Sequence, residues 1–311
     1  MKLAFVFPGQ GSQALGMMNG FAAHPVVRET FAEASDALGD DLWQLVEDGP
    51  AEALSLTTNT QPVMLTAGVA IYRAWLASGG AKPTVVAGHS LGEYTALVAA
   101  GALAFADAVP LVRFRAQAMQ DAVPPGVGAM AAIMGGDDDA VAAACTEAAQ
   151  GQVVEPVNFN APGQVVIAGH REAVERAIAL AKQKGAKRGV LLPVSAPFHS
   201  SLLKPAADKL AARLAQVTFA PPVIPVIHNV DVAEHSAPDA IRAALAQQAA
   251  SPVRWTATVQ HMAALGVTHV VECGPGRVLA GMNKRIADSI EAFALIDSDA
   301  INETLAALKG A

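Results

Sequence analysis

Two hydrophobic patterns alternate along the first 125 residues of the chain. Runs of consecutive apolar residues are typical of strands buried in a parallel sheet, and apolar residues recurring every three or four positions are typical of helices packed on it. The runs "LAFVFPGQG" and "PTVVAGHS" predict two strands that lead into glycine-containing loops. Helices are predicted at His24–Leu38, near Asp41, and at Gln61–Ser78, Leu91–Ala100 and Asp107–Asp121. This order of strands and helices predicts a doubly wound α/β sheet.

The pattern changes in the middle of the chain, where short strands and two helices follow one another closely. Strands are predicted at "GAMAAIMG", "GQVVEPVNF", "GQVVIAG" and "RGVLLPVS", and helices at Asp137–Ala149 and Arg171–Lys184. The resulting order, β-α-β-β-α-β, is that of the ferredoxin-like motif. We therefore expect residues 126–195 to form an inserted ferredoxin-like small domain.

After residue 200 the first pattern returns. Strands are predicted at "VIPVIHNV", at "VTHVVECGPG" and near Phe293, and helices at "SSLLKPAADKLAARLAQ", Pro238–Ala250, Thr256–Leu265, Arg277–Ile290 and from Asp299 onward. We therefore expect residues 1–125 and 196–311 to form one large α/β domain with a mostly parallel sheet.

Composition narrows the class of protein. Hydrophobic residues make up 52% of the chain and charged residues 16%, as in globular proteins. The net charge of −7 argues against a general nucleic-acid-binding protein, which needs a basic face. The two cysteines, Cys145 and Cys273, form no CxxC or Cys/His cluster, so neither a disulfide framework nor a metal site is expected. With no apolar stretch long enough for a membrane span and no signal-peptide core, we expect a cytoplasmic protein.

The segment Gly88-His89-Ser90-Leu91-Gly92 matches the G-x-S-x-G nucleophile elbow. It lies between a predicted strand and a predicted helix, the context in which this motif has meaning. The turn would hold Ser90 in a strained backbone conformation, and the Leu91 N–H at the start of the helix could stabilise an oxyanion. A small residue in a tight turn is the alternative interpretation of Ser90.

A nucleophilic serine needs a base, and the chain has eight histidines. His89 is adjacent to Ser90, but neighbouring side chains diverge at such a turn. His199 is the stronger candidate, because it lies in "VSAPFHSS" at the junction of a predicted strand and helix. The alternative is that His199 only marks the entry to that helix.

No carboxylate can be selected to complete a hydrolase triad. The acidic residues between the serine and the histidine occupy ordinary loop or helix positions: Asp107, Asp121, Asp137, Asp138, Asp139 and Glu155. The upstream loop "FPGQGSQ" is not an HGGG-type oxyanion loop, although the backbone N–H of Gln10 could serve as a second oxyanion donor.

Arg115 interrupts the apolar stripe of the helix "DAVPLVRFRAQAMQDAV". A buried arginine is costly unless it is paired, so two interpretations follow. Arg115 either forms an internal ion pair, for example with Glu93, or binds a carboxylate that arrives with the substrate. In the second case Met119, one turn further on, would line the same pocket.

Six motifs occur in a specific order: "FVFPGQGSQ", "GHSLGEY", "FRAQAMQ", "VNFNAPGQVVIAG", "VSAPFHSSLL" and "VECGPGRVL". Together they resemble the malonyl-CoA:acyl-carrier-protein transacylase family of type II fatty-acid synthesis over nearly the whole chain. The resemblance implies a hydrolase-like large domain with a ferredoxin-like insert. It also implies roles for particular residues: Ser90 as nucleophile, His199 as base, Arg115 as carboxylate clamp, Gln10 and Leu91 as backbone oxyanion donors, Gln248 as the carbonyl that orients His199, and Phe198 as a mark of malonyl-selective members.

The reaction implied by the resemblance is ping-pong transfer of a malonyl group from malonyl-CoA to the phosphopantetheine thiol of acyl carrier protein, with no cofactor and by a monomer. A malonyltransferase of polyketide synthesis, a serine thioesterase or esterase, and a non-catalytic scaffold that binds the carrier protein are the alternatives. Local basic clusters are candidates for docking the acidic carrier protein: Lys182, Lys184, Lys187, Arg188, Lys284 and Arg285.

Overall fold

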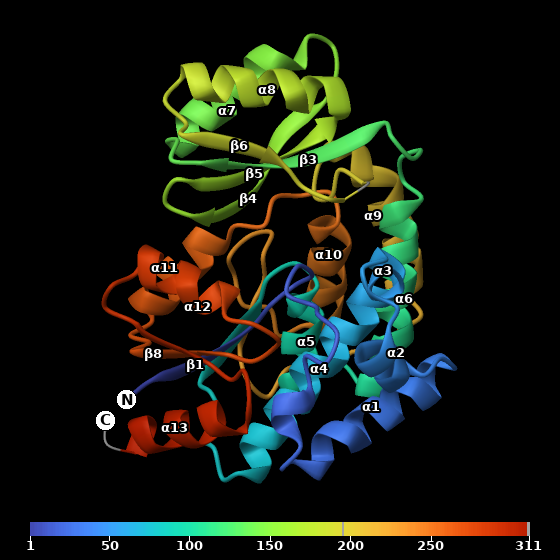
Figure 1. Cartoon of the computed structure of the whole chain (residues 1–311), viewed down its shortest axis with the longest axis vertical. Helices are drawn as coiled ribbons and strands as arrows, with labels where there is room; N and C mark the ends of the chain where they lie inside the picture. Colours follow the sequence, from blue (N-terminus) through green and yellow to red (C-terminus); the bar gives the residue numbers. More distant parts are fainter. Residues whose placement is uncertain (195, 310–311) are drawn as a thin grey trace.

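Two separate sheets organise the chain in the computed structural model, which describes residues 1–194 and 196–309 (Figure 1). The first sheet has five strands in the order β7-β2-β1-β8-β9, and every neighbouring pair runs parallel. Its strands are β1 (Leu3–Phe7), β2 (Val85–Gly88), β7 (Val226–Ile227), β8 (His269–Glu272) and β9 (Glu291–Ala294). The chain is therefore a mixed α/β protein with a parallel sheet, as its apolar runs predicted.

The parallel sheet is buried because its central strands are apolar on both faces. All five residues of β1 are buried, and so are all four of β2. Phe5 and Phe7 pack edge-on against Tyr72 of α4 (Thr57–Ala77), and Phe5 also packs against Trp75. This packing fixes the ends of β1 and β2 side by side, with Phe7 in register with Gly88. The loops that follow these two strands carry the candidate site.

Helices pack on both faces of the parallel sheet, and further helices pack on these. The N-terminal ones are η1 (Asn19–Phe21), α1 (Pro25–Leu38), α2 (Leu42–Asp48), α3 (Ala51–Leu54), α4, α5 (Gly92–Ala99) and α6 (Phe105–Gln120). The C-terminal ones are η2 (Ser201–Leu203), α9 (Lys204–Leu214), α10 (Pro238–Gln248), α11 (Trp255–Ala264), α12 (Val278–Ile286) and α13 (Ser298–Lys309). In the described part of the chain, no helix is both long and apolar enough to span a bilayer.

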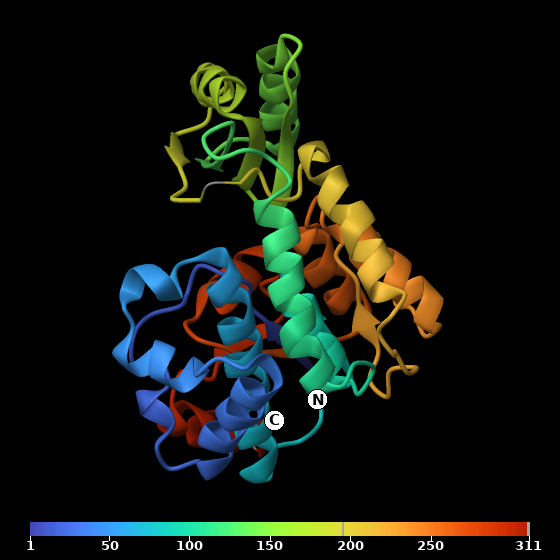
Figure 2. The same ribbon diagram turned by 90° about the vertical axis from the view of Figure 1, so that its right-hand side faces the viewer.

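The second sheet is antiparallel, with the strand order β4-β5-β3-β6. Its elements, in chain order, are β3 (Gly128–Met134), α7 (Asp138–Ala149), β4 (Val154–Ala161), β5 (Gln164–His170), α8 (Arg171–Gln183) and β6 (Arg188–Leu191). Figures 1 and 2 show this sheet and its two helices at one end of the molecule, with the long helix α6 rising toward it from the parallel-sheet part.

Buried side chains from α6, from strands β3, β4 and β5 and from the segment after β6 form one cluster beside the candidate site. Its members include Met119, Met130, Val157, Val166, Phe198 and Leu203. This cluster packs the parts of the molecule that carry the two sheets against each other.

Several predicted elements are longer than the observed ones. The strand predicted at 188–195 ends at Leu191, shortly before Pro193, and Ser195 lies outside the described residues. The strand predicted at 223–230 is reduced to Val226–Ile227, because Pro225 precedes it and His228 and Asn229 leave the sheet to make side-chain contacts. The strand predicted at 267–276 ends at Glu272, before the segment Gly274-Pro275-Gly276. The helix predicted to run to Ile290 ends at Ile286.

Candidate active site

The turn between β2 and α5 has the strained backbone predicted for a nucleophile elbow. Ser90 has φ 51°, in the left-handed region that disfavours residues with a side chain. A Cβ on Gly88 would lie 1.8 Å from the carbonyl carbon of Gly92, and a Cβ on Gly92 would lie 2.0 Å from the carbonyl oxygen of Phe7. Glycine is therefore required on both sides of Ser90, and the strain presents its hydroxyl at the ends of the parallel strands.

Ser90 and His199 form a hydrogen-bonded pair. The Oγ of Ser90 lies 2.7 Å from Nε2 of His199, and Nδ1 of His199 lies 2.9 Å from the main-chain carbonyl oxygen of Gln248. Because a carbonyl only accepts, Nδ1 carries the proton and Nε2 is free to accept the serine hydroxyl. His199 is 4% exposed and also has a positive φ, 65°.

Burial and the nearby guanidinium of Arg115 lower the pKa of His199 to about 3, although the bond to Gln248 works in the opposite direction. The imidazole is consequently neutral at physiological pH, the form that can take a proton from Ser90.

No carboxylate in the described part of the chain hydrogen-bonds to His199. Three of the acidic residues considered from the sequence have other partners. Asp121 accepts from the side chain of Gln117. Asp137 caps α7 through the N–H of Asp139, and Glu155 accepts hydrogen bonds from the backbone and hydroxyl of Ser201. The pair thus lacks the third member of a hydrolase triad, and a peptide carbonyl orients the histidine in its place.

Arg115 is 1% exposed and is surrounded by neutral acceptors. Its Nη1 donates to Oε1 of Gln61 at 2.8 Å, and its Nη2 donates to Oε1 of Gln248 at 2.8 Å and to Oγ of Ser90 at 3.1 Å. Its Cζ lies 5.4 Å from the ring centroid of Tyr94. Burial lowers the pKa of Arg115, but an arginine remains cationic in proteins.

The alternative that Arg115 is paired internally with Glu93 is wrong. Among the residues the structure describes, Arg115 makes no ion pair, and the carboxylate of Glu93 lies 2.7 Å from Nδ1 of His228 instead. A buried cation without a counter-ion is unfavourable, so the site is suited to receiving an anion.

A cavity of about 130 Å³ opens onto these groups. Among its lining residues are those predicted from the sequence apart from Gln248: Gln10, Ser90, Leu91, Arg115, Met119, Phe198 and His199. Gln248 is fully buried and contacts Arg115, Ser90 and His199 without lining the cavity. Residues that were not predicted complete the lining: Gly9, Gln61, His89, Met130, Asn158, Leu192 and Val194.

The backbone N–H groups of Gln10 and Leu91 have no hydrogen-bond partner within the described residues. Both residues line the cavity, and Leu91 immediately precedes the first residue of α5. Free N–H groups beside a nucleophile, one of them at the start of a helix, are suited to stabilising a developing negative charge.

His89 is turned to a different partner. Its Nε2 lies 2.8 Å from Oδ1 of Asn160, and its ring packs 5.6 Å from that of Trp255. Burial lowers the pKa of His89. The prediction that His89 is not the base for Ser90 is consistent with these contacts.

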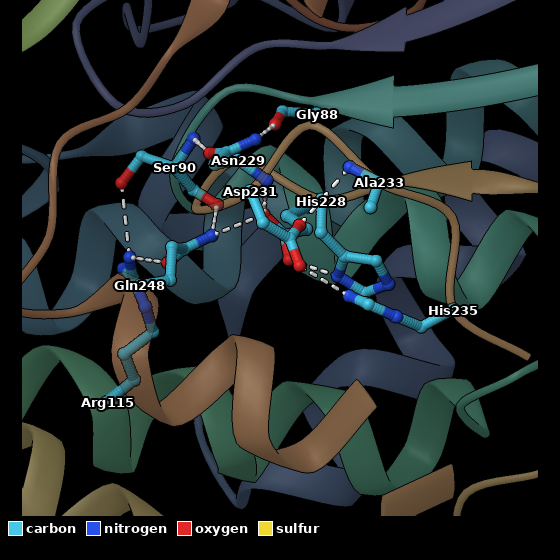
Figure 3. A network of polar contacts seen from close by, with 10 residues as sticks. Gly88, Ser90, Arg115, His228, Asn229, Asp231, Ala233, His235 and Gln248 are labelled. Carbon is cyan, nitrogen blue, oxygen red and sulfur yellow. Dashed lines mark hydrogen bonds and ion pairs between the residues drawn. The ribbon is translucent and has the colours of Figure 1, made fainter. Parts of the chain in front are cut away.

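A polar network behind Ser90 was not predicted (Figure 3). The side chain of Asn229 accepts from the N–H of Ser90 at 2.8 Å and donates to the carbonyl of Gly88 at 2.7 Å. The carboxylate of Glu93 accepts from His228, from the N–H of Asn229 and from the side chain of Gln248. A glutamate within the apolar segment "GEYTALVAA" and the polar pair after "VIPVI" are the signals that could have identified these residues.

Residues 4–305 match the family described as "Acyl transferase domain". The malonyl CoA-acyl carrier protein transacylase of Escherichia coli (strain K12) is 60% identical over 305 residues, which cover 98% of this chain and 99% of that protein. The protein of the same name from Bacillus subtilis (strain 168) is 44% identical over 310 residues, covering 99% and 98% of the two chains.

Solved structures agree over the same length. The acyl-carrier-protein S-malonyltransferase of Burkholderia pseudomallei 1710b has a TM-score of 0.97 at 64% identity, covering 98% of this chain and 100% of that one. A malonyl-transacylase solved in complex with its type II PKS acyl-carrier protein has a TM-score of 0.97 at 53% identity, covering 99% and 100%.

Proposed function

The chain belongs to the acyl transferase family, and on this premise we propose that it transfers the malonyl group of malonyl-CoA to the phosphopantetheine thiol of acyl carrier protein through Ser90. The activity is that of its full-length relatives. The observation that carries the choice of acyl group is Arg115, a buried cation that forms no ion pair within the described residues and whose Nη2 lies 3.1 Å from the serine hydroxyl. A short acyl group with a free carboxylate supplies the missing anion.

In the first half-reaction, Nε2 of His199 takes the proton of the Ser90 hydroxyl as Oγ attacks the thioester carbonyl of malonyl-CoA. The carbonyl oxygen becomes an oxyanion, which the N–H groups of Gln10 and Leu91 stabilise. The tetrahedral intermediate then collapses: the C–S bond breaks, and the imidazolium returns its proton to the leaving sulfur. Coenzyme A leaves as the thiol, and the malonyl group stays as an ester of Ser90.

In the second half-reaction, the phosphopantetheine thiol of the carrier protein enters the cavity. His199 takes the thiol proton, the sulfur attacks the malonyl ester, and the bond to Oγ breaks as the proton returns to Ser90. The main-chain carbonyl of Gln248, 2.9 Å from Nδ1, keeps the same ring nitrogen facing the reacting atoms in both halves. This reaction requires no cofactor.

Arg115 binds the malonyl carboxylate during both halves. A guanidinium can donate two parallel hydrogen bonds to a carboxylate, and in a buried site these bonds are strong. Its neutral partners Gln61 and Gln248 hold it without cancelling its charge. Met119 and Phe198 supply apolar lining around the acyl chain.

We also propose a two-domain organisation and a cytoplasmic location. Residues 1–125 and 196–311 would form the hydrolase-like large domain, and residues 126–195 the ferredoxin-like insert. Separate sheets and a separate cluster of buried residues within 129–186 support this division. Cys145 and Cys273 are buried free thiols, as expected in a reducing compartment.

A malonyltransferase serving polyketide synthesis remains a second candidate, because one similar structure contains a type II PKS carrier protein. The two candidates share the chemistry at Ser90 and differ only in the carrier protein. Comparing transfer rates to a fatty-acid and a polyketide carrier protein distinguishes them.

The test of the proposed function is intact-mass analysis after incubation with malonyl-CoA, with Ser90→Ala as the control. We expect one malonyl adduct that maps to Ser90, is stable without carrier protein, and moves to the carrier protein when it is added. Free malonate released in the absence of carrier protein would indicate a thioesterase, and the absence of any adduct would indicate a non-catalytic binding protein.

A further inference from the structure

Glu93 is a fully buried carboxylate at the start of α5, three residues after the nucleophile. Its Oε1 lies 2.7 Å from Nδ1 of His228, and its Oε2 accepts from the N–H of Asn229 and from Nε2 of Gln248, both at 2.9 Å. Both oxygens are therefore fully engaged by donors, and none of these donors belongs to the cavity lining.

One branch of these contacts holds the elbow. The backbone of Asn229 is fixed by Glu93, and the Asn229 side chain bridges the N–H of Ser90 and the carbonyl of Gly88. These bonds connect the turn on both sides of the strained φ of Ser90. Strained conformations persist only where the surroundings over-determine them, so the branch through Asn229 helps to keep Ser90 in place.

The second branch holds the groups that act on the substrate. An ionised carboxylate only accepts hydrogen bonds, so Glu93 selects the orientation in which the Gln248 amide turns its nitrogen inward. That nitrogen also donates to the carbonyl of Ser90, at 2.9 Å. The amide oxygen is left facing Arg115, where it accepts from Nη2 at 2.8 Å. The reversed amide would present its N–H groups to the guanidinium and repel it.

His228 lies 2.7 Å from Glu93 and forms an ion pair with it when protonated. The bond from Nδ1 makes His228 the donor, and its Nε2 has no partner within the described residues. Burial alone would lower the pKa of His228, but the Glu93 carboxylate raises it above its ordinary value. Both carboxylate oxygens of Glu93 are thus bonded to donors other than Arg115, and the guanidinium keeps its hydrogen bonds to neutral acceptors.

We propose that Glu93 is a positioning residue for malonyl transfer: through Gln248 it fixes Arg115 for the malonyl carboxylate, and through Asn229 it fixes the turn that carries Ser90. This inference rests on the proposed function, since it concerns how that site selects its acyl group.

The test compares malonyl with acetyl transfer in two variants. In Glu93→Met the new side chain has a similar length but no hydrogen-bond acceptor. The Gln248 amide then loses its fixed orientation, and Arg115 loses the amide oxygen that accepts from it. We expect the ratio of malonyl to acetyl kcat/KM to fall roughly ten- to hundredfold, the effect of a lost hydrogen bond to a charged group. Glu93→Gln can keep its oxygen toward Gln248 and Asn229 and donate to neutral His228, and we expect it to recover most of the lost ratio.

Glu272→Met is the matched control, because Glu272 is also fully buried but accepts from the N–H of Ala280 and does not line the cavity. The malonyl-to-acetyl ratio does not depend on the fraction of folded protein, so a general loss of stability cannot change it. An unchanged ratio in Glu93→Met, with a loss of Tm like that of Glu272→Met, would overturn the proposal.

Glu93→Asp is a third variant, used if Glu93→Met does not fold. It keeps the charge but shortens the side chain by one methylene, which withdraws the carboxylate from Gln248, and the ratio should again fall. If the malonyl-to-acetyl ratio of Glu93→Asp equals that of the wild-type protein, the proposal is overturned. Failure of the proposed function itself is distinguishable, because the unchanged chain would then form no malonyl ester on Ser90.

Discussion

Nη2 of Arg115 donates a hydrogen bond to Oγ of Ser90 across 3.1 Å. The serine oxygen therefore accepts from the cation on one side while its own proton points to Nε2 of His199, 2.7 Å away. A guanidinium this close to the nucleophile can reach only a carboxylate that lies close to the reacting carbonyl. The malonyl group, with one methylene between these two carbons, satisfies that condition.

Removing the cation should remove the preference for malonyl. In Arg115→Ala we expect malonyl transfer to fall roughly 100- to 1000-fold in kcat/KM, because a buried charge-assisted contact with the substrate is lost. Transfer of neutral acyl groups should continue. Arg113→Ala is the matched control, since Arg113 lies on the same helix and pairs at the surface with Asp40. Equal losses of malonyl and acetyl transfer in Arg115→Ala would contradict the clamp role.

A carboxylate placed beside Arg115 should also weaken the use of malonyl-CoA. In Gln61→Glu the new carboxylate would lie where Oε1 now accepts from Nη1 of Arg115, at 2.8 Å. It would neutralise the cation and compete with the substrate, so KM for malonyl-CoA should rise roughly 10- to 100-fold while acetyl transfer changes little. Gln61→Met, which removes the acceptor without adding charge, should cost clearly less. Steady-state kinetics with both thioesters measures the difference.

As the pH is lowered, kcat/KM should begin to fall only far below the ordinary pKa of histidine. His199 acts as a base only when neutral, and burial together with Arg115 lowers its pKa to about 3. The kcat/KM for a neutral acyl thioester should thus stay constant as the pH falls from 7 through 6.5, and decline only at much lower pH. In Arg115→Ala the decline should move to higher pH, because one of the groups that lower the pKa is gone. A decline centred near pH 6.5 in the unchanged chain would contradict a buried neutral base.

Glu272 should make stability depend on pH in the direction opposite to most carboxylates. Burial raises its pKa from 4.5 to about 7, despite the N–H groups at the start of α12. Because the folded pKa is the higher one, this contribution to stability is complete below pH 4.5 and is lost as the pH rises through 7. The loss amounts to about 3 kcal/mol at most. Glu272→Gln should flatten this fall in the free energy of unfolding between pH 5 and 8, as measured by urea denaturation. An identical slope in both proteins would show that Glu272 does not titrate in this range.

Charge reversal at Lys284 and Arg285 should weaken use of the carrier protein. Both are exposed at the end of α12, and Arg285 donates to the side chain of Gln164 and to the carbonyl of Pro162. We expect KM for the acidic carrier protein to rise roughly tenfold at low salt, with formation of the malonyl ester unchanged. The control reverses Lys209 and Lys309, which are exposed and lie outside the basic clusters. An unaltered KM for carrier protein would exclude this docking surface.

The features that could be predicted are those that depend on residues close together in the sequence. Ser90 was identified because its glycines and the flanking strand and helix are contiguous, and Arg115 because a charge on an apolar stripe stands out within one helix. Strand ends were less predictable, because side-chain contacts made after folding decide where β7 stops.

The supporting contacts could not be predicted, because each joins segments far apart in the chain. Gln61 reaches Arg115 from α4, and Glu93 meets His228 across 135 positions. Glutamine, glutamate and asparagine have no local pattern that separates a buried role from an exposed one. The partner of Arg115 was for this reason sought in Glu93, its near neighbour in sequence, when it lay in Gln61 and Gln248.

The separation between Ser90 and its partners has a consequence for protein synthesis. Ser90 precedes His199 by 109 positions and Gln248 by 158. At ordinary translation rates the ribosome therefore adds the histidine and its orienting carbonyl on the order of ten seconds after the serine. Throughout that interval the growing chain carries a serine with no base, so a polypeptide that ends before residue 199 lacks the pair on which malonyl transfer depends.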